Sequence, residues 1–282
     1  MQYLNLVDHA YPLESAAFAP LFFDSPESRV KQLIKSYAAI LVFSFSFDLE
    51  ENLNRITKNP VHRIPPRSVP EKRQHITRYI LDRLQHTGLI DTMVKNETLP
   101  RHFLNRTTIP IKTLKPYRII IHPGSGSFKK NWPLSRFMEV GCRLKSLGMK
   151  PEWILGPAEY HCQDELNRND VEAEIIDDLI DLTQAFMHAA GFVGNDSGVS
   201  HLSAFLGLPT VVIFGPSDPE RWAPMGNHVR IAGPDAAEKD LKCRPCFETP
   251  ATACYNQVCL ENISPAQVMN DLIELIPTAI QV

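Results

Sequence analysis

The 282-residue sequence contains no apolar run approaching the ~20 residues that a membrane-spanning helix needs. Its first residues, MQYLNLVDHAYPLE, lack the basic start and apolar core of a signal peptide. Its net charge of -3 lacks the positive excess typical of nucleic-acid-binding proteins, so we expect no nucleic-acid partner. There is no internal repeat and no low-complexity tract, and a hydrophobic fraction of 44% is enough for packed cores. We therefore expect a globular, cytoplasmic protein.

The pattern of the chain predicts two domains, residues 1–115 and residues 116–282, joined near IKTLKPYR. In the first, we expect a helix over SPESRVKQLIKSYA, a buried strand over residues 38–47 and a helix near residues 73–86. In the second, strands and helices alternate, with strands at YRIIIHPG, PEWILG, VEAEII, GFVGND and PTVVIFG. This alternation predicts an α/β fold with a parallel sheet and helices on its faces.

A glycine- and lysine-containing loop, HPGSGSFKKNWP, follows the first strand of the second domain. Gly124 and Gly126 allow a ligand to approach the backbone, Ser125 adds a hydroxyl, and Lys129 and Lys130 add charge. The helix that follows directs its free N–H groups back at the same place, which suits a phosphate. The loop matches neither G-x-G-x-x-G nor a Walker loop, and an ordinary strand-to-helix turn with solvated lysines is the alternative.

Two further polar segments follow strand ends at the same sheet edge. In GNDSGVSHLS, Asp196 or Ser197 can cap a helix, and His201 lies one turn further on the same side, where it can donate to an anion. In LGPAE, Glu159 can accept hydrogen bonds from ribose hydroxyls, or it is simply a first-turn carboxylate favoured by the helix dipole. Together these segments predict a site for a nucleotide diphosphate.

The stretches HPGSGSFKKNWPLSRF, GFVGNDSGVSHLSAFLGLPTVVIFGPSDPERWAPMG and CRPCFETPATACYNQVCLENISPAQV resemble glycosyltransferase family 9, the ADP-heptose:lipopolysaccharide heptosyltransferases. The resemblance implies a GT-B fold, with two Rossmann-like domains facing a cleft. It implies inverting transfer of heptose or a related sugar from an ADP-sugar to the lipopolysaccharide core, with no cofactor required. The implied partners are a nucleotide-sugar donor and an anionic lipid-linked sugar acceptor, with peripheral contact at the cytoplasmic face of the inner membrane.

The resemblance also implies roles for individual residues. Ser125 and Gly126 resemble the diphosphate loop of the family, and Lys130, rather than Lys129, resembles its phosphate-binding lysine. Glu159 resembles the ribose ligand. The residues expected to hold the diphosphate and the sugar are Asp196, Ser197, Gly198 and His201.

The start of the chain departs from the family pattern. Family members open with a strand and a Gly-rich loop whose aspartate is thought to be the catalytic base, and no such loop is found here. We therefore expect an N-terminal domain that is incomplete by about one βα unit or more, with Asp8 and His9 as the candidates for the base. Two alternatives to an active transferase remain. One is a catalytically impaired nucleotide-sugar-binding relative or a fragment of a longer enzyme. The other is a different GT-B enzyme, such as a nucleotide-sugar epimerase.

Two segments keep open interpretations. Residues 55–78 hold seven Lys or Arg against one Glu, and we expect a loop that either binds the anionic acceptor or is simply solvated. The four cysteines near the C-terminus, spaced C-x2-C-x7-C-x4-C, indicate either a structural zinc site or packing of a loop. These cysteines are Cys243, Cys246, Cys254 and Cys259.

Overall fold

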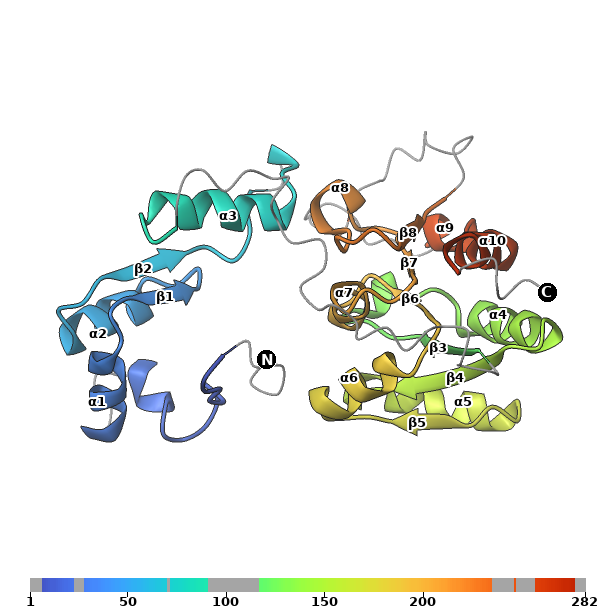
Figure 1. Cartoon of the computed structure of the whole chain (residues 1–282), viewed down its shortest axis with the longest axis horizontal. Helices are drawn as coiled ribbons and strands as arrows, with labels where there is room; N and C mark the ends of the chain where they lie inside the picture. The colour runs from blue at the N-terminus through green and yellow to red at the C-terminus, as the bar shows by residue number, and fades with distance from the viewer. Residues whose placement is uncertain are drawn as a thin grey trace. The chain divides into compact units, whose positions relative to one another are not determined.

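The computed structural model describes residues 7–22, 28–69, 72–90, 117–234, 246 and 257–276. The chain divides into two compact units, residues 1–97 and residues 98–282 (Figure 1). The domain boundary expected near residue 115 lies outside the described residues. Within the described residues, no helix has both the length and the apolar character that crossing a bilayer requires.

Unit 1 is built around a short βαβ arrangement. Its parallel strands β1 and β2 pair from Ile40 with Val61 to Phe43 with Ile64, and helix α2 connects them. A small core that includes Val30, Val42 and Leu53 packs the helices against one face of this sheet. The elements of the unit are η1 (Ala19–Phe22), α1 (Ser28–Ser36), β1 (Ile40–Phe43), α2 (Asp48–Ile56), β2 (Val61–Ile64) and α3 (Ile76–His86).

One expectation for this unit was wrong and one was confirmed. The strand expected over residues 38–47 is limited to β1, and Leu41 and Phe43 are exposed because the described helices cover only the opposite face, which carries Val42. The basic segment 55–78 is a loop for most of its described length, as expected, with residues 57–60, 65–69 and 73–75 outside helix and strand. It also contains β2, whose backbone pairs with β1, and the first residues of α3.

Unit 2 contains a six-stranded sheet in the order β5-β4-β3-β6-β7-β8, with every pair parallel. Counted along the unit, this is the 3-2-1-4-5-6 order of a Rossmann sheet. The strands are β3 (Arg118–His122), β4 (Lys150–Leu155), β5 (Ala173–Ile175), β6 (Gly191–Asn195), β7 (Thr210–Ile213) and β8 (Val229–Ala232). The expected α/β class with a parallel sheet is confirmed.

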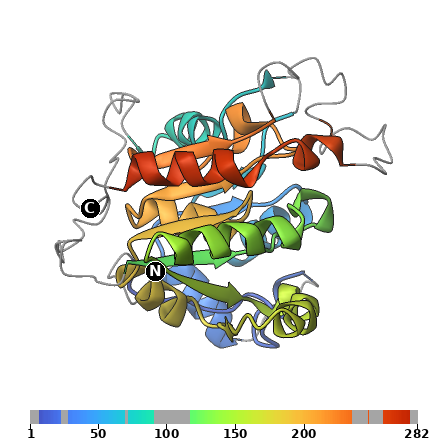
Figure 2. The same ribbon diagram turned by 90° about the vertical axis from the view of Figure 1, so that its right-hand side faces the viewer.

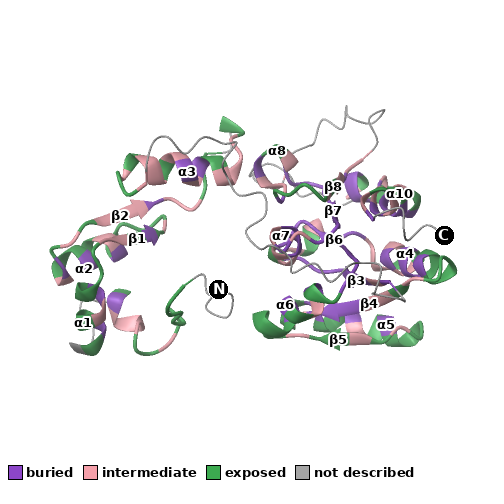
Figure 3. Cartoon of the chain, in the orientation of Figure 1, coloured by how far each residue is buried: buried purple, intermediate pink, exposed green. Residues whose placement is uncertain are grey.

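Helices cover both faces of this sheet because the central strands are apolar on both sides (Figures 2 and 3). Ile119 and Ile121 of β3 belong to the core shared with α4 and α10, whereas Ile120 belongs to the core shared with α6. The alternation follows from the two-residue period of a strand. The helices are η5 (Phe128–Lys130), α4 (Leu134–Ser146), η6 (Pro157–Cys162), α5 (Gln163–Arg168), α6 (Leu179–Met187), α7 (Gly198–Phe205), α8 (Pro219–Trp222), α9 (Val258–Glu261) and α10 (Pro265–Leu275).

Local signals explain most of these boundaries. Helix α4 ends just before Gly148, which has a φ of 72° and provides a left-handed stop. The stretch AEYHCQDELNR forms a 3-10 turn, η6, followed by α5, because Pro157 and Glu159 form a tight turn at Gly156. Strand β8 and helix α10 were not predicted, although Ser264 caps α10 by accepting from the Gln267 N–H.

Replacement of Phe137 by alanine tests the core around α4. The Phe137 ring is fully buried and packs edge-to-face on Trp132, with ring centroids 5.0 Å apart. We expect Phe137→Ala to lower the free energy of unfolding by about 3–5 kcal/mol in denaturant titrations. Phe128→Ala, at a ring that is 74% exposed, is the control and should change stability by less than about 0.5 kcal/mol. Equal losses in the two variants would contradict this packing.

Candidate functional site

The candidate site lies at the C-terminal ends of β3 and β6. These two strands are neighbours in the sheet, paired from Ile119 with Gly191 to His122 with Gly194, although they are far apart in sequence. The strand order reverses direction between them, and this is where open α/β sheets place their ligands. The two loops predicted to bind the diphosphate therefore start side by side.

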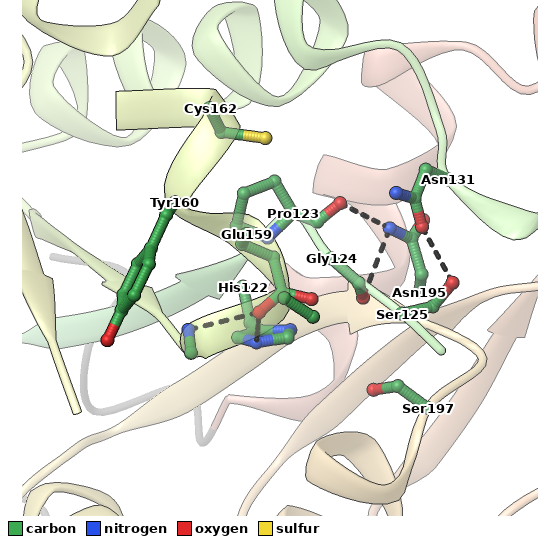
Figure 4. A network of polar contacts seen from close by, with 12 residues as sticks. His122, Pro123, Gly124, Ser125, Asn131, Glu159, Tyr160, Cys162, Asn195 and Ser197 are labelled. Carbon is green, nitrogen blue, oxygen red and sulfur yellow. Dashed lines mark hydrogen bonds and ion pairs between the residues drawn. The ribbon is translucent and has the colours of Figure 1, made fainter. Parts of the chain in front are cut away.

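Asn195, the last residue of β6, joins the two loops. Its side chain is fully buried, and its amide N–H donates to the Pro123 carbonyl at 2.6 Å (Figure 4). Its Oδ1 accepts from the Trp132 backbone N–H at 3.0 Å. One side chain thus holds the first loop, here called the β3 loop (residues 123–132), at both of its ends.

The indole of Trp132 extends this connection to the C-terminal part of the chain. Its Nε1 lies 3.1 Å from each of the backbone carbonyls of Leu260 and Ile263, while its ring is buried on Phe137. A buried indole N–H that has acceptors carries no desolvation penalty, so Trp132 anchors the loop in the core.

Ser125 lies inside the β3 loop rather than on its surface. Its hydroxyl is 2.6 Å from Asn131 Oδ1 and 2.8 Å from the Ser127 carbonyl, and its single proton can go to one of them at a time. The side chain of Ser127 caps the η5 turn by accepting from the Lys129 N–H. Gly126, between them, is exposed, and a Cβ built there would meet no atom within 4 Å.

The second loop leads from β6 into α7. Ser197 caps α7 by accepting from the Ser200 N–H, and the Ser200 hydroxyl donates back to the Asn195 carbonyl at 2.5 Å. Gly198 is exposed, and here too an added Cβ would meet nothing within 4 Å. Both loops therefore present bare backbone to the same edge of the sheet, with the N-terminus of α7 directed at it.

Lys130 and Asp196 connect the two loops by charge. Lys130 Nζ lies 3.2 Å from Asp196 Oδ2, and the two side chains are only 15% and 10% exposed. The pair brings together two residues that the sequence placed in separate predicted phosphate loops. It also fixes the ammonium group of Lys130 at the mouth of both loops, so that the ion pair defines where an anion would meet a positive charge.

Glu159 lies in η6, beyond the end of β4, packed beneath the β3 loop. It is 4% exposed, and its Oε2 accepts from the Gly156 N–H at 3.0 Å. His122 Nε2 is 3.6 Å from the same oxygen (Figure 4). The Glu159 side chain occupies the space in which Gly124 would carry a Cβ, since that atom would come within 2.0 Å of its Cγ and Oε1.

The environment of Glu159 favours its ionised form. Burial by itself raises the pKa of the carboxyl, but His122 and the Gly156 N–H outweigh that effect, so the pKa lies below its ordinary value. A carboxylate with its position fixed on three sides is available as a hydrogen-bond acceptor at neutral pH. That chemistry fits a hydroxyl-bearing ligand.

The structure places the remaining predicted site residues, His201, Asp8 and His9, without testing their roles. His201 lies in the first turn of α7, where its N–H bonds to the Ser197 carbonyl. Asp8 and His9 are exposed, in a described segment of unit 1 without helix or strand. Their assignment as the base stays a prediction.

The cysteine cluster is only partly described. Cys243 and Cys254 lie outside the described residues, Cys246 donates its backbone N–H to the Pro216 carbonyl, and Cys259 is buried in the core. No group of three or more potential metal ligands occurs within the described residues. The zinc assignment stays a prediction.

Sequence reasoning missed two residues of the site, Asn195 and His122. Each is a polar residue that ends a buried apolar strand, GFVGN and RIIIH. Because a buried polar group needs a partner, such a strand ending is a usable signal, although it does not name the partner.

Comparison with known sequences gives a family. The model of glycosyltransferase family 9 (heptosyltransferase) matches residues 66–253. Lipopolysaccharide heptosyltransferase 3 of Escherichia coli K12 is 27% identical over 124 residues, which is 41% of this chain and 36% of that protein. Lipopolysaccharide heptosyltransferase 1 of Pseudomonas aeruginosa is 26% identical over 140 residues, 49% of this chain and 38% of that protein. This chain thus aligns with less than two fifths of the length of either relative.

Comparison with solved structures supports the fold. A glycosyltransferase family 9 protein from Veillonella parvula superposes with a TM-score of 0.61 at 20% identity, over 88% of this chain and 76% of that one. The E. coli heptosyltransferase WaaC with ADP superposes with a TM-score of 0.59 at 17% identity, over 93% of this chain and 79% of that one. E. coli ADP-heptose lps heptosyltransferase II superposes with a TM-score of 0.56 at 18% identity, over 88% of this chain and 79% of that one. The chain therefore has the fold of these GT-B proteins.

The pKa of Glu159 has a consequence for stability. Because the folded pKa lies below the unfolded one, ionised Glu159 stabilises the fold at pH values above the unfolded pKa, and that contribution is lost as the pH falls through the folded pKa. We expect Glu159→Gln to be less stable than wild type at pH 7, with a difference that shrinks as the pH is lowered below about 4.3. Urea titrations from pH 7 to pH 3 measure it, and a difference that grows with acidification would contradict the assignment.

Proposed function

We propose, since the chain belongs to glycosyltransferase family 9, that it transfers heptose or a related sugar from an ADP-sugar to the lipopolysaccharide core. The observation that carries the proposal is the Lys130–Asp196 contact of 3.2 Å across the two loops at the switch point of the sheet. It brings a fixed cation, two exposed glycines and a helix N-terminus to one place, as a bound diphosphate requires.

The donor would bind with its diphosphate between the two loops. Asp196 neutralises part of the charge of Lys130, so the backbone N–H groups near Gly126 and Gly198 would supply the remaining attraction. Glu159, fixed beneath the β3 loop, would accept hydrogen bonds from the ribose hydroxyls. His201, one turn into α7, would donate to the diphosphate or the sugar.

In the proposed reaction, an acceptor hydroxyl attacks the anomeric carbon of the donor sugar from the face opposite the diphosphate. The bond from the anomeric carbon to the diphosphate oxygen breaks, and the configuration inverts. Negative charge grows on the leaving ADP, and groups already fixed in position stabilise that charge without having to reorganise. Lys130 and the N-terminus of α7 are those groups, and no cofactor takes part in this scheme.

The acceptor in this proposal is an anionic lipid-linked sugar, met at the cytoplasmic face of the inner membrane. The basic segment 55–78 supports it by composition, with Arg67 among its exposed residues. Asp8 or His9 would take the proton from the attacking hydroxyl.

An assay of ADP release tests the activity. Purified protein is mixed with ADP-heptose and a deacylated inner-core acceptor, and ADP is measured over time. We expect release that depends on the acceptor, with the transferred sugar detected by mass spectrometry. ADP binding without any transfer would overturn the transferase proposal in favour of a nucleotide-sugar-binding protein.

Adjacent lysines provide a matched test of the diphosphate assignment. Lys130→Ala removes the cation that pairs with Asp196, and we expect ADP to bind about 10- to 100-fold more weakly, as for the loss of one charge-assisted hydrogen bond. Lys129 is exposed, so Lys129→Ala should change affinity by less than about twofold. Calorimetry measures both, and equal effects would show that Lys130 does not contact the diphosphate.

A further inference from the structure

His122 is a buried polar residue at the end of β3, and it takes no part in the contacts between the β3 loop and the loop from β6 into α7. It ends β3 after three isoleucines that are fully buried, and it is itself only 2% exposed. An apolar side chain would suit this position, because burying an imidazole costs free energy unless its polar atoms are used. The use of those atoms is therefore informative.

The two ring nitrogens of His122 differ sharply. Nε2 is directed at the Glu159 carboxylate, 3.6 Å from Oε2 (Figure 4). Nδ1 is buried and has no hydrogen-bond partner among the described residues. A bare nitrogen tolerates this position better than an N–H group, so the geometry assigns the proton of a neutral ring to Nε2, facing the carboxylate. The ring therefore makes its one polar contact with Glu159.

The position of the Glu159 carboxylate depends on few groups. The Gly156 N–H holds Oε2 from one side at 3.0 Å, and the bare Cα of Gly124 leaves the space that the side chain fills. His122 Nε2 makes the second polar contact of Oε2, at 3.6 Å. Without it, the carboxylate would keep one hydrogen bond, about which it could rotate.

We propose that His122 is a positioning residue that orients the Glu159 carboxylate toward the vicinal hydroxyls of the donor ribose. This inference rests on the proposed function. Two adjacent hydroxyls donate together to one carboxylate only when its plane is correctly turned, and Oε1 and the free lone pairs of Oε2 remain to accept them. His122 thereby determines the preference for a ribonucleotide over a deoxyribonucleotide without touching the donor.

The experiment compares the binding of ADP and 2′-deoxy-ADP to the full chain by calorimetry. Wild type should prefer ADP by about tenfold or more, because a hydrogen bond to a charged group is lost with the hydroxyl. His122→Phe keeps an aromatic ring but has no hydrogen-bond donor. In this variant, the affinity for ADP should fall to that for 2′-deoxy-ADP, while the affinity for 2′-deoxy-ADP should stay within about twofold of the wild-type value. His122→Gln places an amide N–H near the same point and should restore most of the preference.

Combination with Glu159→Ala tests whether His122 acts through the carboxylate. The variant Glu159→Ala should lose the preference, and adding His122→Phe to it should change ADP affinity no further. If His122→Phe does not fold, His122→Asn, whose amide is too short to reach Glu159, takes its place with the same expected loss.

Two results would overturn the inference: an equal loss of affinity for both nucleotides in the His122 variants, which indicates a structural role, or an unchanged preference. Failure of the proposed function looks different. In that case wild type itself binds neither nucleotide, and the inference falls with it.

Discussion

The pairing of β3 with β6 is the constraint on which the site depends. Both loops that face the proposed donor begin where these strands end, and Asn195 holds the β3 loop to the end of β6 through contacts with Pro123 and Trp132. The contact between the two loops follows from that junction. Lys130 reaches Asp196 because the loops start side by side, and Ser200 returns a hydrogen bond to the Asn195 carbonyl that keeps the second loop in register.

In the site, buried side chains hold the backbone in place, and exposed main chain is left to contact a ligand. Asn195, Trp132 and Ser200 are saturated with partners inside the protein and hold the backbone in place. The exposed elements are mostly main chain, at Gly126 and Gly198. An anion would therefore meet groups whose positions are already fixed, so that little ordering entropy is lost on binding.

Much of unit 2 could be predicted from the sequence because its signals are local. The apolar strand YRIII, the helix stop at Gly148 and the cap at Ser197 each depend on neighbouring residues alone. Strand β8 was missed because it is four residues long and only Ala232 in it is fully buried. Helix α10 carried a readable signal in its Ser-Pro start. In unit 1, the extent of the strand over residues 38–47 depended on which sheet face is covered, and this is a tertiary property.

The candidate site was predicted as a set of residues but not as a structure. Lys130 and Asp196 were both named, yet their contact joins residues 66 positions apart, and no local pattern encodes it. Glu159 was expected from its place after a strand, but its dependence on Gly124 and His122 joins two segments that are far apart in the sequence. Asn195 was overlooked because a polar residue at the end of an apolar strand does not name its partners, and Pro123 and Trp132 come from the neighbouring strand's loop.

The seam between β3 and β6 also bears on how the chain folds. Strands β3 to β5 and strands β6 to β8 can each form from nearby βα segments, whereas their junction closes a loop of some 70 residues, as the Asn195 to Pro123 bond shows. Closing long loops is the slow part of folding an α/β sheet. The candidate site exists only where the two half-sheets are joined, so a ligand bound across this junction would stabilise the native state relative to states in which the half-sheets are apart.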